Sequence, residues 1–544
     1  MLLLLLLTSA VWGQVYVPVA GEYGVDDERK LILLRGSASD LRGVTELKLN
    51  DQRFIMHEPV DAKSPKHSYN VARGEIIYAL QFTELPLFTL TTNEAIGDEP
   101  KVGVQVTYSD NDQTFRASGG VEYRGGFSLE LSKKSLDLEF NDDVQFGELR
   151  NDDDWILDAL YNEPLRVNAF VGHKLWLEQH RLAYANQEPR AQPGPGVELV
   201  EVFLNNTYAG LYLLSEQIDR KQLRLKKTRD GVIRGELYKG EDDQLGTDFG
   251  DNPPLPDYAS ENWSGYELKH PKADEIIDWG NLYAFHQFVT ETSDAEFTAG
   301  IAERFDLDNA ADFLLFINLL GMADNASRNL FTARYDRDSP YFHLPWDLDG
   351  SFGNSPRGDR IAATDFWYGN ALYRRLTQLN AGGFNDLLCA RYGELRNSGV
   401  YSVKNIAGKL TTAVDLLIRS GTAGREKMAW PKTASVNVET LAYTEDWLVK
   451  RLDFMDNFVC ALAAKIDGSS TNSTLQVFPN PSNGIIAIEQ QAGDISPVFQ
   501  VYDLKGQRLY SGLAGLRSTI DLSHLPPGTY YVKMGENATT VFIR

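Results

Sequence analysis

The stretch from Phe313 to Gly353 constrains the fold more than any other part of this chain. It opens with a nearly continuous apolar run, Phe313 to Met322, which is typical of a buried helix. A polar break follows, and then two strand-like runs, Asn329 to Tyr335 and Tyr341 to Pro345, are separated by turn residues. The sequence therefore predicts a buried helix followed by a β-hairpin.

Oxygen-bearing side chains lie at the ends of these predicted elements, at Asp324, Asn329, Asp347 and Asp349. Oxygen ligands from the ends of a loop and a hairpin can converge on one hard cation. Phosphoryl transfer needs a carboxylate that orients the attacking hydroxyl, and an amide and a carboxylate that hold magnesium. Asp324 and Asn329 have the Asp-x-x-x-x-Asn spacing of a protein-kinase catalytic loop. A second interpretation is that these residues only cap a helix and close turns.

Four segments carry a resemblance to a known family. They follow one another along the chain as Tyr123 to Ser135, Leu204 to Asp219, Arg328 to Phe331 and Pro345 to Gly353. On these segments the sequence resembles the spore-coat protein H (CotH) kinase family. The resemblance implies an α+β class with a divergent, two-lobed protein-kinase-like fold. It also implies transfer of the ATP γ-phosphate to protein.

Under this resemblance, Asp324 is the predicted catalytic residue, which orients the acceptor hydroxyl. Asn329, Asp347 and Asp349 are the predicted metal ligands, for Mg²⁺ with Mn²⁺ as an alternative. Which of the two later aspartates is the primary ligand stays open, because both can reach a metal from opposite sides of the turn.

The predicted contacts to ATP are Arg124, Lys134 and Glu216. Arg124 precedes two glycines, in a turn where backbone amides can approach phosphates. Lys134 is preferred over Lys133 as the cation that contacts phosphate. Glu216 leaves a predicted hairpin at the hinge that faces adenine. Each residue also has a structural interpretation, namely a plain turn, a solvated lysine pair and an ordinary strand exit.

Two further features of the predicted small lobe stay open. The chain has no G-x-G-x-x-G motif in this region, a departure from ordinary kinases that the CotH family shares. Glu163 and Glu178 are equal candidates for the helix-borne glutamate that pairs with the lysine.

The later segment Asp230 to Pro256, rich in Gly, Asp and Pro, is expected to be an ordered-to-mobile insertion. Its acidic run, Glu241 to Asp243, does not match a calcium-binding loop.

The chain is expected to contain five parts. The first, residues 1–13, is an apolar run followed by small residues, which predicts a secretory signal peptide. The others are a β-rich extension (14–83), the CotH kinase-like domain (84–466), a linker rich in Ser and Thr (467–474) and a compact β-sandwich (475–544). Period-two patterning from Leu85 onward predicts an antiparallel sheet at the start of the kinase-like domain.

The last part is similar to the type A sorting domain of the Bacteroidetes type IX secretion system. The resemblance rests on Leu475 to Gly484, Phe499 to Gln507 and Ile520 to Lys533. It implies export, with the type IX secretion machinery as a partner. The protein is then secreted or attached at the outer-membrane cell surface.

Charge and cysteine content narrow the function further. The chain has 76 acidic and 53 basic residues, a formal charge of −23, which disfavours binding to nucleic acid or to an anionic membrane. No later stretch has the apolar length of a transmembrane span. Cys389 and Cys460 both lie on apolar helical patterns, and in an exported chain they form either one disulfide or two buried thiols.

Together these features predict a secreted or surface-displayed atypical protein kinase that acts on Ser or Thr of a secreted or surface protein. One alternative is a catalytically silent, kinase-like protein for surface interaction or adhesion. Another is a carbohydrate- or polymer-associated surface protein whose accessory β domains do the binding.

Overall fold

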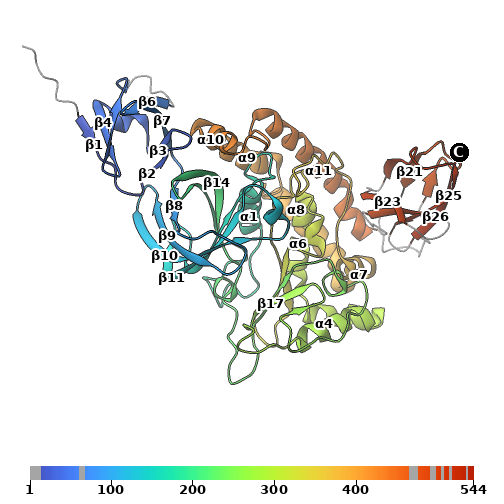
Figure 1. Cartoon of the computed structure of the whole chain (residues 1–544). Helices are drawn as coiled ribbons and strands as arrows, with labels where there is room; N and C mark the ends of the chain where they lie inside the picture. Colours follow the sequence, from blue (N-terminus) through green and yellow to red (C-terminus); the bar gives the residue numbers. More distant parts are fainter. Residues whose placement is uncertain are drawn as a thin grey trace, which may run out of the picture. The chain divides into compact units, whose positions relative to one another are not determined.

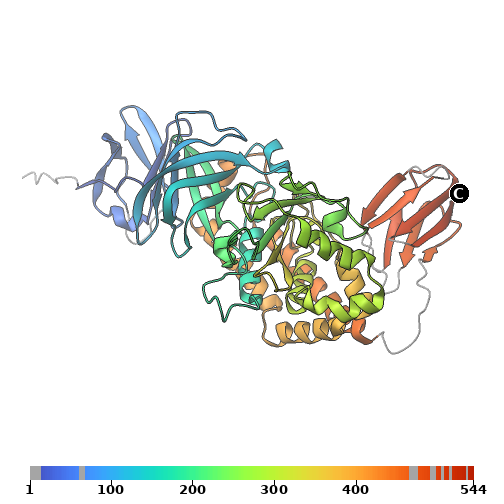
Figure 2. The same cartoon turned by 90° about the horizontal axis from the view of Figure 1, so that it is seen from below.

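The computed structural model of this protein describes residues 14–60, 68–464, 476–489, 498–503, 508–513, 517–534 and 537–544. The predicted signal peptide and the predicted linker lie outside the described residues. The chain forms two compact units. Unit 1 contains Met1–Phe170, Gly196–Gln217 and Thr412–Asn437, and unit 2 contains Val171–Pro195, Ile218–Thr411 and Val438–Arg544. Figures 1 and 2 show their helices and strands.

Unit 1 begins with a seven-stranded sheet in the order β1-β4-β5-β6-β7-β3-β2 (Figure 1). Its buried side chains include Leu47, Phe54 and Leu80, which belong to one apolar core. The β-rich character predicted for this region is therefore present. The strands are β1 (Gln14–Tyr16), β2 (Tyr23–Asp26), β3 (Leu31–Arg35), β4 (Val44–Leu49), β5 (Gln52–Met56), β6 (Ser68–Arg73) and β7 (Ile76–Thr83).

The second part of unit 1 is a closed barrel in the order β10-β11-β12-β14-β13-β8-β9. The sequence predicts an antiparallel sheet, but β8 pairs with β13 in parallel and with β9 in antiparallel fashion, so the sheet closes on itself. Closure leaves no unpaired strand edge. Aromatic side chains fill the interior, where Phe146 contacts Phe88, Tyr108 and Trp155. The strands are β8 (Leu87–Thr91), β9 (Val102–Ser109), β10 (Thr114–Arg124), β11 (Ser135–Gln145), β12 (Asn151–Asp158), β13 (Val197–Leu204) and β14 (Thr207–Glu216).

Unit 2 is organised around α6 (Leu307–Leu320), which begins at the N-cap Asp306 and ends at Gly321 with φ 77°. Every side chain of α6 from Asn309 to Leu320 is buried, as the apolar run predicts. The hairpin predicted after it is also present, as β18 (Leu330–Arg334) and β19 (Tyr341–Pro345). The other helices of unit 2 with at least seven residues are α4 (Gly280–Glu291), α5 (Asp294–Gly300), α7 (Ala371–Leu379), α8 (Phe384–Asn397) and α11 (Val438–Ala464). The unit boundaries fall within α1 (Asn168–Gln179) and α9 (Val403–Arg419), and α10 (Thr422–Ala429) belongs to unit 1.

The five-stranded sheet of unit 2 has the order β16-β17-β15-β18-β19, in which β16 is Asn262–Trp263. Its central strand, β15 (Glu236–Gly240), lies within the segment that the sequence assigns to an insertion, so that prediction is wrong. β15 is hydrogen-bonded to β17 (Tyr266–His270) on one side and to β18 on the other. This strand is short and is flanked by Gly, Asp and Pro residues, which favour the prediction of a loop.

Residues 476–544 form two sheets, β20-β21-β24 and β23-β22-β25-β26 (Figure 2). Ile486 and Ile520 of the first sheet share one apolar core with Val501 and Val532 of the second. This is the arrangement of a β-sandwich. The strands are β20 (Gln476–Phe478), β21 (Ile485–Glu489), β22 (Val498–Tyr502), β23 (Arg508–Leu513), β24 (Arg517–Asp521), β25 (Gly528–Met534) and β26 (Asn537–Ile543).

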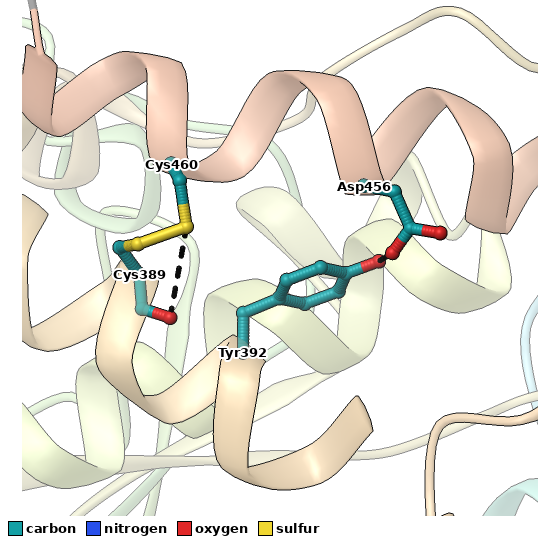
Figure 3. The surroundings of a disulfide bond; sticks show 4 residues. All are labelled: Cys389, Tyr392, Asp456 and Cys460. Carbon is teal, nitrogen blue, oxygen red and sulfur yellow. Dashed lines mark hydrogen bonds between the residues drawn. A yellow bond between two sulfur atoms is a disulfide. The ribbon is translucent and has the colours of Figure 1, made fainter. Parts of the chain in front are cut away.

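A disulfide joins Cys389 of α8 to Cys460 of α11, with Cα atoms 4.7 Å apart (Figure 3). Of the two alternatives that the sequence leaves open, the structure contains the bonded pair. One helical turn from each cysteine, the Tyr392 hydroxyl donates a hydrogen bond of 2.8 Å to Asp456 Oδ1. The two helices of unit 2 are thus joined by a covalent bond and by a polar contact beside it.

We expect the double variant Cys389→Ser, Cys460→Ser to lose about 4 kcal/mol of unfolding free energy. The bond closes a loop across a sequence separation of 71 residues, and a loop of this length restricts the unfolded chain by about that amount. Urea unfolding of the variant and of oxidised wild-type protein measures the difference. Reduced wild-type protein is the control and should match the variant; equal stability of oxidised and reduced protein would contradict the expectation.

Three histidines of unit 2, His173, His286 and His343, are buried. Burial lowers the pKa of each to about 3, because an imidazolium in an apolar interior loses its hydration. His286 stacks on Phe249 with ring centroids 4.0 Å apart, and His343 Nδ1 lies 2.9 Å from the Tyr373 hydroxyl. All three are therefore neutral in the folded protein at physiological pH.

Acid should destabilise the fold through these histidines. The pKa of an unfolded histidine is about 6.5, so the unfolded chain takes up protons that the folded chain excludes as the pH falls from about 6.5 toward 3. Each histidine then removes up to about 1.4 kcal/mol of unfolding free energy per pH unit. The variant His286→Phe keeps an aromatic ring against Phe249 but cannot take up a proton. Between pH 6 and pH 4 its unfolding free energy should therefore fall less than that of the wild type, by the contribution of one histidine. Denaturant unfolding at both pH values tests this, and an unchanged acid dependence in the variant would show the expectation to be wrong.

Candidate functional site

Strand register brings the central candidate residues together in unit 2. Gly240 of β15 pairs with Leu330 of β18, which pairs with Pro345 of β19. The ladder continues one residue further, because the Asn329 N–H donates to the Gly240 carbonyl and the Trp346 N–H donates to the Asn329 carbonyl, both at 2.9 Å. Asn329 and Trp346 are therefore neighbours, and Asp347 follows directly.

The side-chain amide of Asn325 holds this end of the hairpin closed. Its Nδ2 donates to the carbonyl oxygens of Asn329 and Trp346, each at 2.7 Å, and the residue is only 2% exposed. Sequence reasoning missed this role, because Asn325 lies in a polar break where its type is ordinary for a loop. The position is thus a buried clamp between the two strand ends.

Two of the predicted metal ligands have an unusual backbone. Asn329 has φ 53° and Asp347 has φ 56°, which is the left-handed region. Asn and Asp adopt this region more readily than other residues with a side chain, but the conformation still carries strain that often occurs at functional sites. The two residues on either side of the hairpin end thus share one conformational feature.

Asp324 lies in the single 3₁₀ turn η4 (Asp324–Ala326) just before these residues. Its carbonyl accepts the Arg328 N–H at 2.9 Å, and its carboxylate Oδ2 accepts from Arg328 Nη2 at 2.8 Å. The Asp324 side chain is 30% exposed. Among the contacts of the described residues, its Oδ1 has no hydrogen-bond donor. A hydroxyl can therefore approach that oxygen.

The predicted metal ligands have different surroundings. Asp347 is exposed, and Asp349 is half-buried with its carbonyl accepting the Ser351 N–H at 3.0 Å. Among the described residues, Asp324, Asp347 and Asp349 do not form a group in which one carboxylate oxygen from each lies within 4.8 Å of the others. The convergence of Asn329, Asp347 and Asp349 on one ion stays a prediction. The amide of Asn329 and the carboxylate of Asp347 still fit Mg²⁺, which takes few protein ligands and completes its shell with phosphate and water oxygens.

A group of close carboxylates does occur in unit 1, at Asp143, Asp152 and Asp153. Asp152 is buried, and its Oδ1 accepts the Asp153 N–H at 2.8 Å. Asp152 also forms an ion pair of 3.2 Å with Arg150. These contacts are those of a structural carboxylate at the β11–β12 turn region.

The two adjacent lysines of unit 1 have different environments. Lys133 is fully buried, and its ammonium lies 3.0 Å from Glu426 Oε1, donates to the Leu211 carbonyl and sits over the Tyr212 ring at 4.4 Å. Burial lowers the pKa of Lys133 to about 8, although Glu426 acts in the opposite direction. Lys134 is partly exposed and donates to the Leu129 carbonyl. Lys134 is therefore the more accessible of the two lysines, and its role as a phosphate contact stays a prediction.

Neither glutamate proposed as a partner for the lysine has that role among the described contacts. Glu163 is buried, and its carboxylate accepts the N–H groups of Asn168 and Ala169 at 2.7 and 2.9 Å, at the start of α1. Burial raises the pKa of Glu163 to about 8. Glu178 forms an ion pair of 2.8 Å with Lys409 in unit 2. The partner that the sequence missed is Glu426 of α10, and nothing in its local sequence distinguishes it.

The other two predicted ATP contacts differ in accessibility. Arg124 is half-buried at the end of β10, beside Gly125 with φ 101°. Glu216 is 1% exposed, and its carboxylate accepts the N–H groups of Arg150 and Gly196 at 2.8 and 3.0 Å. These contacts support the structural interpretation of Glu216 as a strand-exit residue rather than a ligand to ATP.

A cavity of about 570 Å³ in unit 2 lies at the turn end of the β18–β19 hairpin. Tyr335, Asp336 and Pro340 line it, together with His180. Asn329 and Asp347 lie at the opposite, open end of the same hairpin. The cavity is therefore separate from the candidate catalytic residues.

Comparison with known proteins places these residues in a family. Residues 121–455, more than half of the chain, match the family model described as CotH kinase protein. This chain belongs to the CotH kinase protein family. The match spans Asp324, Asn329, Asp347 and Asp349, and so confirms the resemblance read from the sequence.

A relative with a curated description is the Inner spore coat protein H of Bacillus subtilis (strain 168), which is 23% identical to this CotH-family chain over 245 residues. The similarity covers 45% of this chain and 61% of the relative. The chain thus spans about three fifths of the length of that relative.

The C-terminal part defines the destination of the protein. Residues 476–544 match the model described as a secretion system C-terminal sorting domain, which confirms the second resemblance. This domain indicates secretion through the type IX system to the cell surface, and so involves the type IX machinery as a partner. Within the described ranges, every helix is too short or too polar to span a bilayer.

Replacing Asn325 by Ala should cost about 2 kcal/mol of unfolding free energy, because a buried carbonyl of Trp346 loses its donor. Asn325→Asp should cost at least as much, since a carboxylate cannot donate to two carbonyl oxygens. Asn457→Ala is the control; Asn457 is exposed, and its amide binds a single carbonyl one helical turn away. Urea unfolding measures all three, and an equal effect at positions 325 and 457 would remove the clamp assigned to Asn325.

Proposed function

We propose that this CotH-family protein is a secreted or surface-displayed atypical protein kinase. It transfers the γ-phosphate of ATP to a Ser or Thr hydroxyl of a secreted or surface protein. The observation that carries the proposal is the arrangement of unit 2, where the partly exposed Asp324 carboxylate lies one turn before the Asn329–Asp347 hairpin end. A carboxylate beside an amide–carboxylate pair is the minimal protein equipment for phosphoryl transfer.

In this proposal Asp324 Oδ1 accepts a hydrogen bond from the acceptor hydroxyl and takes its proton as the oxygen attacks the γ-phosphorus. The bond from phosphorus to the ADP oxygen breaks as the new O–P bond forms, so that phosphoprotein and ADP result. Asp324 Oδ2 stays on Arg328 during this step. Most of the rate enhancement comes from orientation of the hydroxyl and from charge stabilisation.

Asn329 and Asp347 would hold Mg²⁺, which neutralises the charge on the phosphates, and Mn²⁺ can replace it in such oxygen sites. Asp349 stays a candidate ligand beside them. Within unit 1, Arg124 and Lys134 have partly accessible side chains and stay the proposed contacts to ATP. Lys133 forms a buried ion pair with Glu426, so its role is structural.

The proposal is tested with purified mature protein, labelled ATP and Mg²⁺, by measuring phosphate incorporated into protein. We expect Asp324→Asn to lower kcat by about 100-fold or more with little change in ATP affinity, since a general base contributes about that factor. We expect Asp347→Asn to weaken Mg²⁺-dependent ATP binding instead. Asp308→Asn is the matched control, because Asp308 is an exposed carboxylate in the first turn of α6.

Equal incorporation by the wild type and by the Asp324 and Asp347 variants would overturn the proposal. ATP binding by a wild-type protein that transfers no phosphate would also overturn it, and would favour a catalytically silent surface protein.

A further inference from the structure

The acidic turn Glu241–Asp243, which has no role in the function proposed above, lies beside the candidate catalytic residue. It follows β15 directly, and the last residue of β15, Gly240, pairs with the first residue of β18, Leu330. The strands run antiparallel, so the residues after β15 lie next to the residues before β18. Those residues include Ser327 and Arg328.

A continuous chain of contacts leads from this turn to Asp324. The Ser327 hydroxyl donates to Asp243 Oδ1, and Asp243 Oδ2 lies 3.6 Å from Arg328 Nε. The other side of the same guanidinium donates from Nη2 to Asp324 Oδ2 at 2.8 Å. One planar group thus connects the two carboxylates, with Asp243 at its Nε side and Asp324 at its Nη2 side.

The consequence for Asp324 is a defined orientation of its two oxygens. A carboxylate on an exposed turn rotates about its last torsion with little preference. The guanidinium offers donors in a fixed plane, so its contact to Oδ2 restricts that rotation and leaves Oδ1 facing away from Arg328. Asp243, itself bound by the Ser327 hydroxyl, forms an ion pair with Arg328, which is a long side chain, 38% exposed, with several rotatable bonds.

We propose that Arg328, held by Asp243, is a positioning residue that presents Asp324 Oδ1 to the acceptor hydroxyl. This inference rests on the proposed kinase function and adds to it two residues that do not touch the substrate. The contact between Arg328 and Asp324 matters for geometry rather than for stability, because ion pairs this exposed contribute little to folding. A small displacement of a reacting group, however, lowers the rate strongly.

The test compares Asp243→Asn and Arg328→Gln with wild-type full-length protein, by phosphate transfer from labelled ATP with Mg²⁺. We expect kcat to fall about 10-fold or more in both variants, with KM for ATP changed less than about 2-fold. The reason is that Asp243 and Arg328 orient Asp324 toward the acceptor hydroxyl and do not act on the nucleotide. Asp251→Asn is the matched control. It removes the same charge at an exposed position later in this segment, where the carboxylate accepts the Asn252 N–H.

Conservative variants separate positioning from charge. Arg328→Lys keeps the charge but loses the planar fork, so we expect it to stay well below wild-type kcat, whereas Asp243→Glu keeps the carboxylate and should recover more activity than Asp243→Asn. Thermal unfolding of each variant should match wild type.

Wild-type activity with unchanged kcat in Asp243→Asn and Arg328→Gln would overturn this inference and leave the kinase proposal intact. An equal fall in Asp251→Asn, or a fall in kcat that follows a fall in Tm, would also overturn it. A wild-type protein without phosphate transfer would overturn the kinase proposal itself.

Discussion

The register of three strands, β15, β18 and β19, is the constraint on which the candidate site depends. Gly240, Leu330 and Pro345 lie in one row across these strands, and the hydrogen bonds at Asn329 and Trp346 extend the ladder by one residue. A shift by one residue would turn every side chain to the opposite face. The register therefore decides which polar residues meet at this end of the sheet.

The strand ends at this edge are held by different kinds of contact. Asn325 joins the two ends of the hairpin from within the buried interior. Arg328 joins the turn after β15 to Asp324 at the surface. Loss of the first contact should lower the unfolding free energy strongly, because its groups are buried away from water. Loss of the second should change the unfolding free energy little, because the ion pair is partly exposed. A buried structural contact and a partly exposed ion pair thus occur close together in unit 2.

In unit 1, neighbouring charges on α10 hold this helix against the barrel. Arg425 makes two hydrogen bonds of 2.8 and 2.7 Å to Glu201, and Glu426 accepts from Lys133 and from the Leu211 N–H at 3.0 and 2.9 Å. All of these charged groups are buried, so removal of one would leave its partner unpaired away from water. The helix is therefore restricted to one orientation by two adjacent ionic contacts.

Local pattern predicted a large part of this architecture. The apolar run before Met322 could only be a buried helix, and the alternating runs after Asn329 could form a hairpin because their turn residues were in place. The sandwich at the C-terminus likewise followed from short runs separated by turns. Patterns of this kind depend on neighbours along the chain, so they are visible without a fold. The strand β15 escaped this reading, since its five residues are flanked by residues typical of loops.

The sequence by itself determined the family and the destination at the cell surface, and it identified Asp324, Asn329 and Asp347 as candidate site residues. Each of these depends on short motifs of residues that are close together in the chain. Only the tertiary structure decided that the barrel closes, that Cys389 and Cys460 are bonded and that Lys133 pairs with Glu426. It also decided that Asp243 reaches Arg328. Each of these is a contact between residues far apart in the chain, and its partner depends on strand register and helix packing, which no local pattern records.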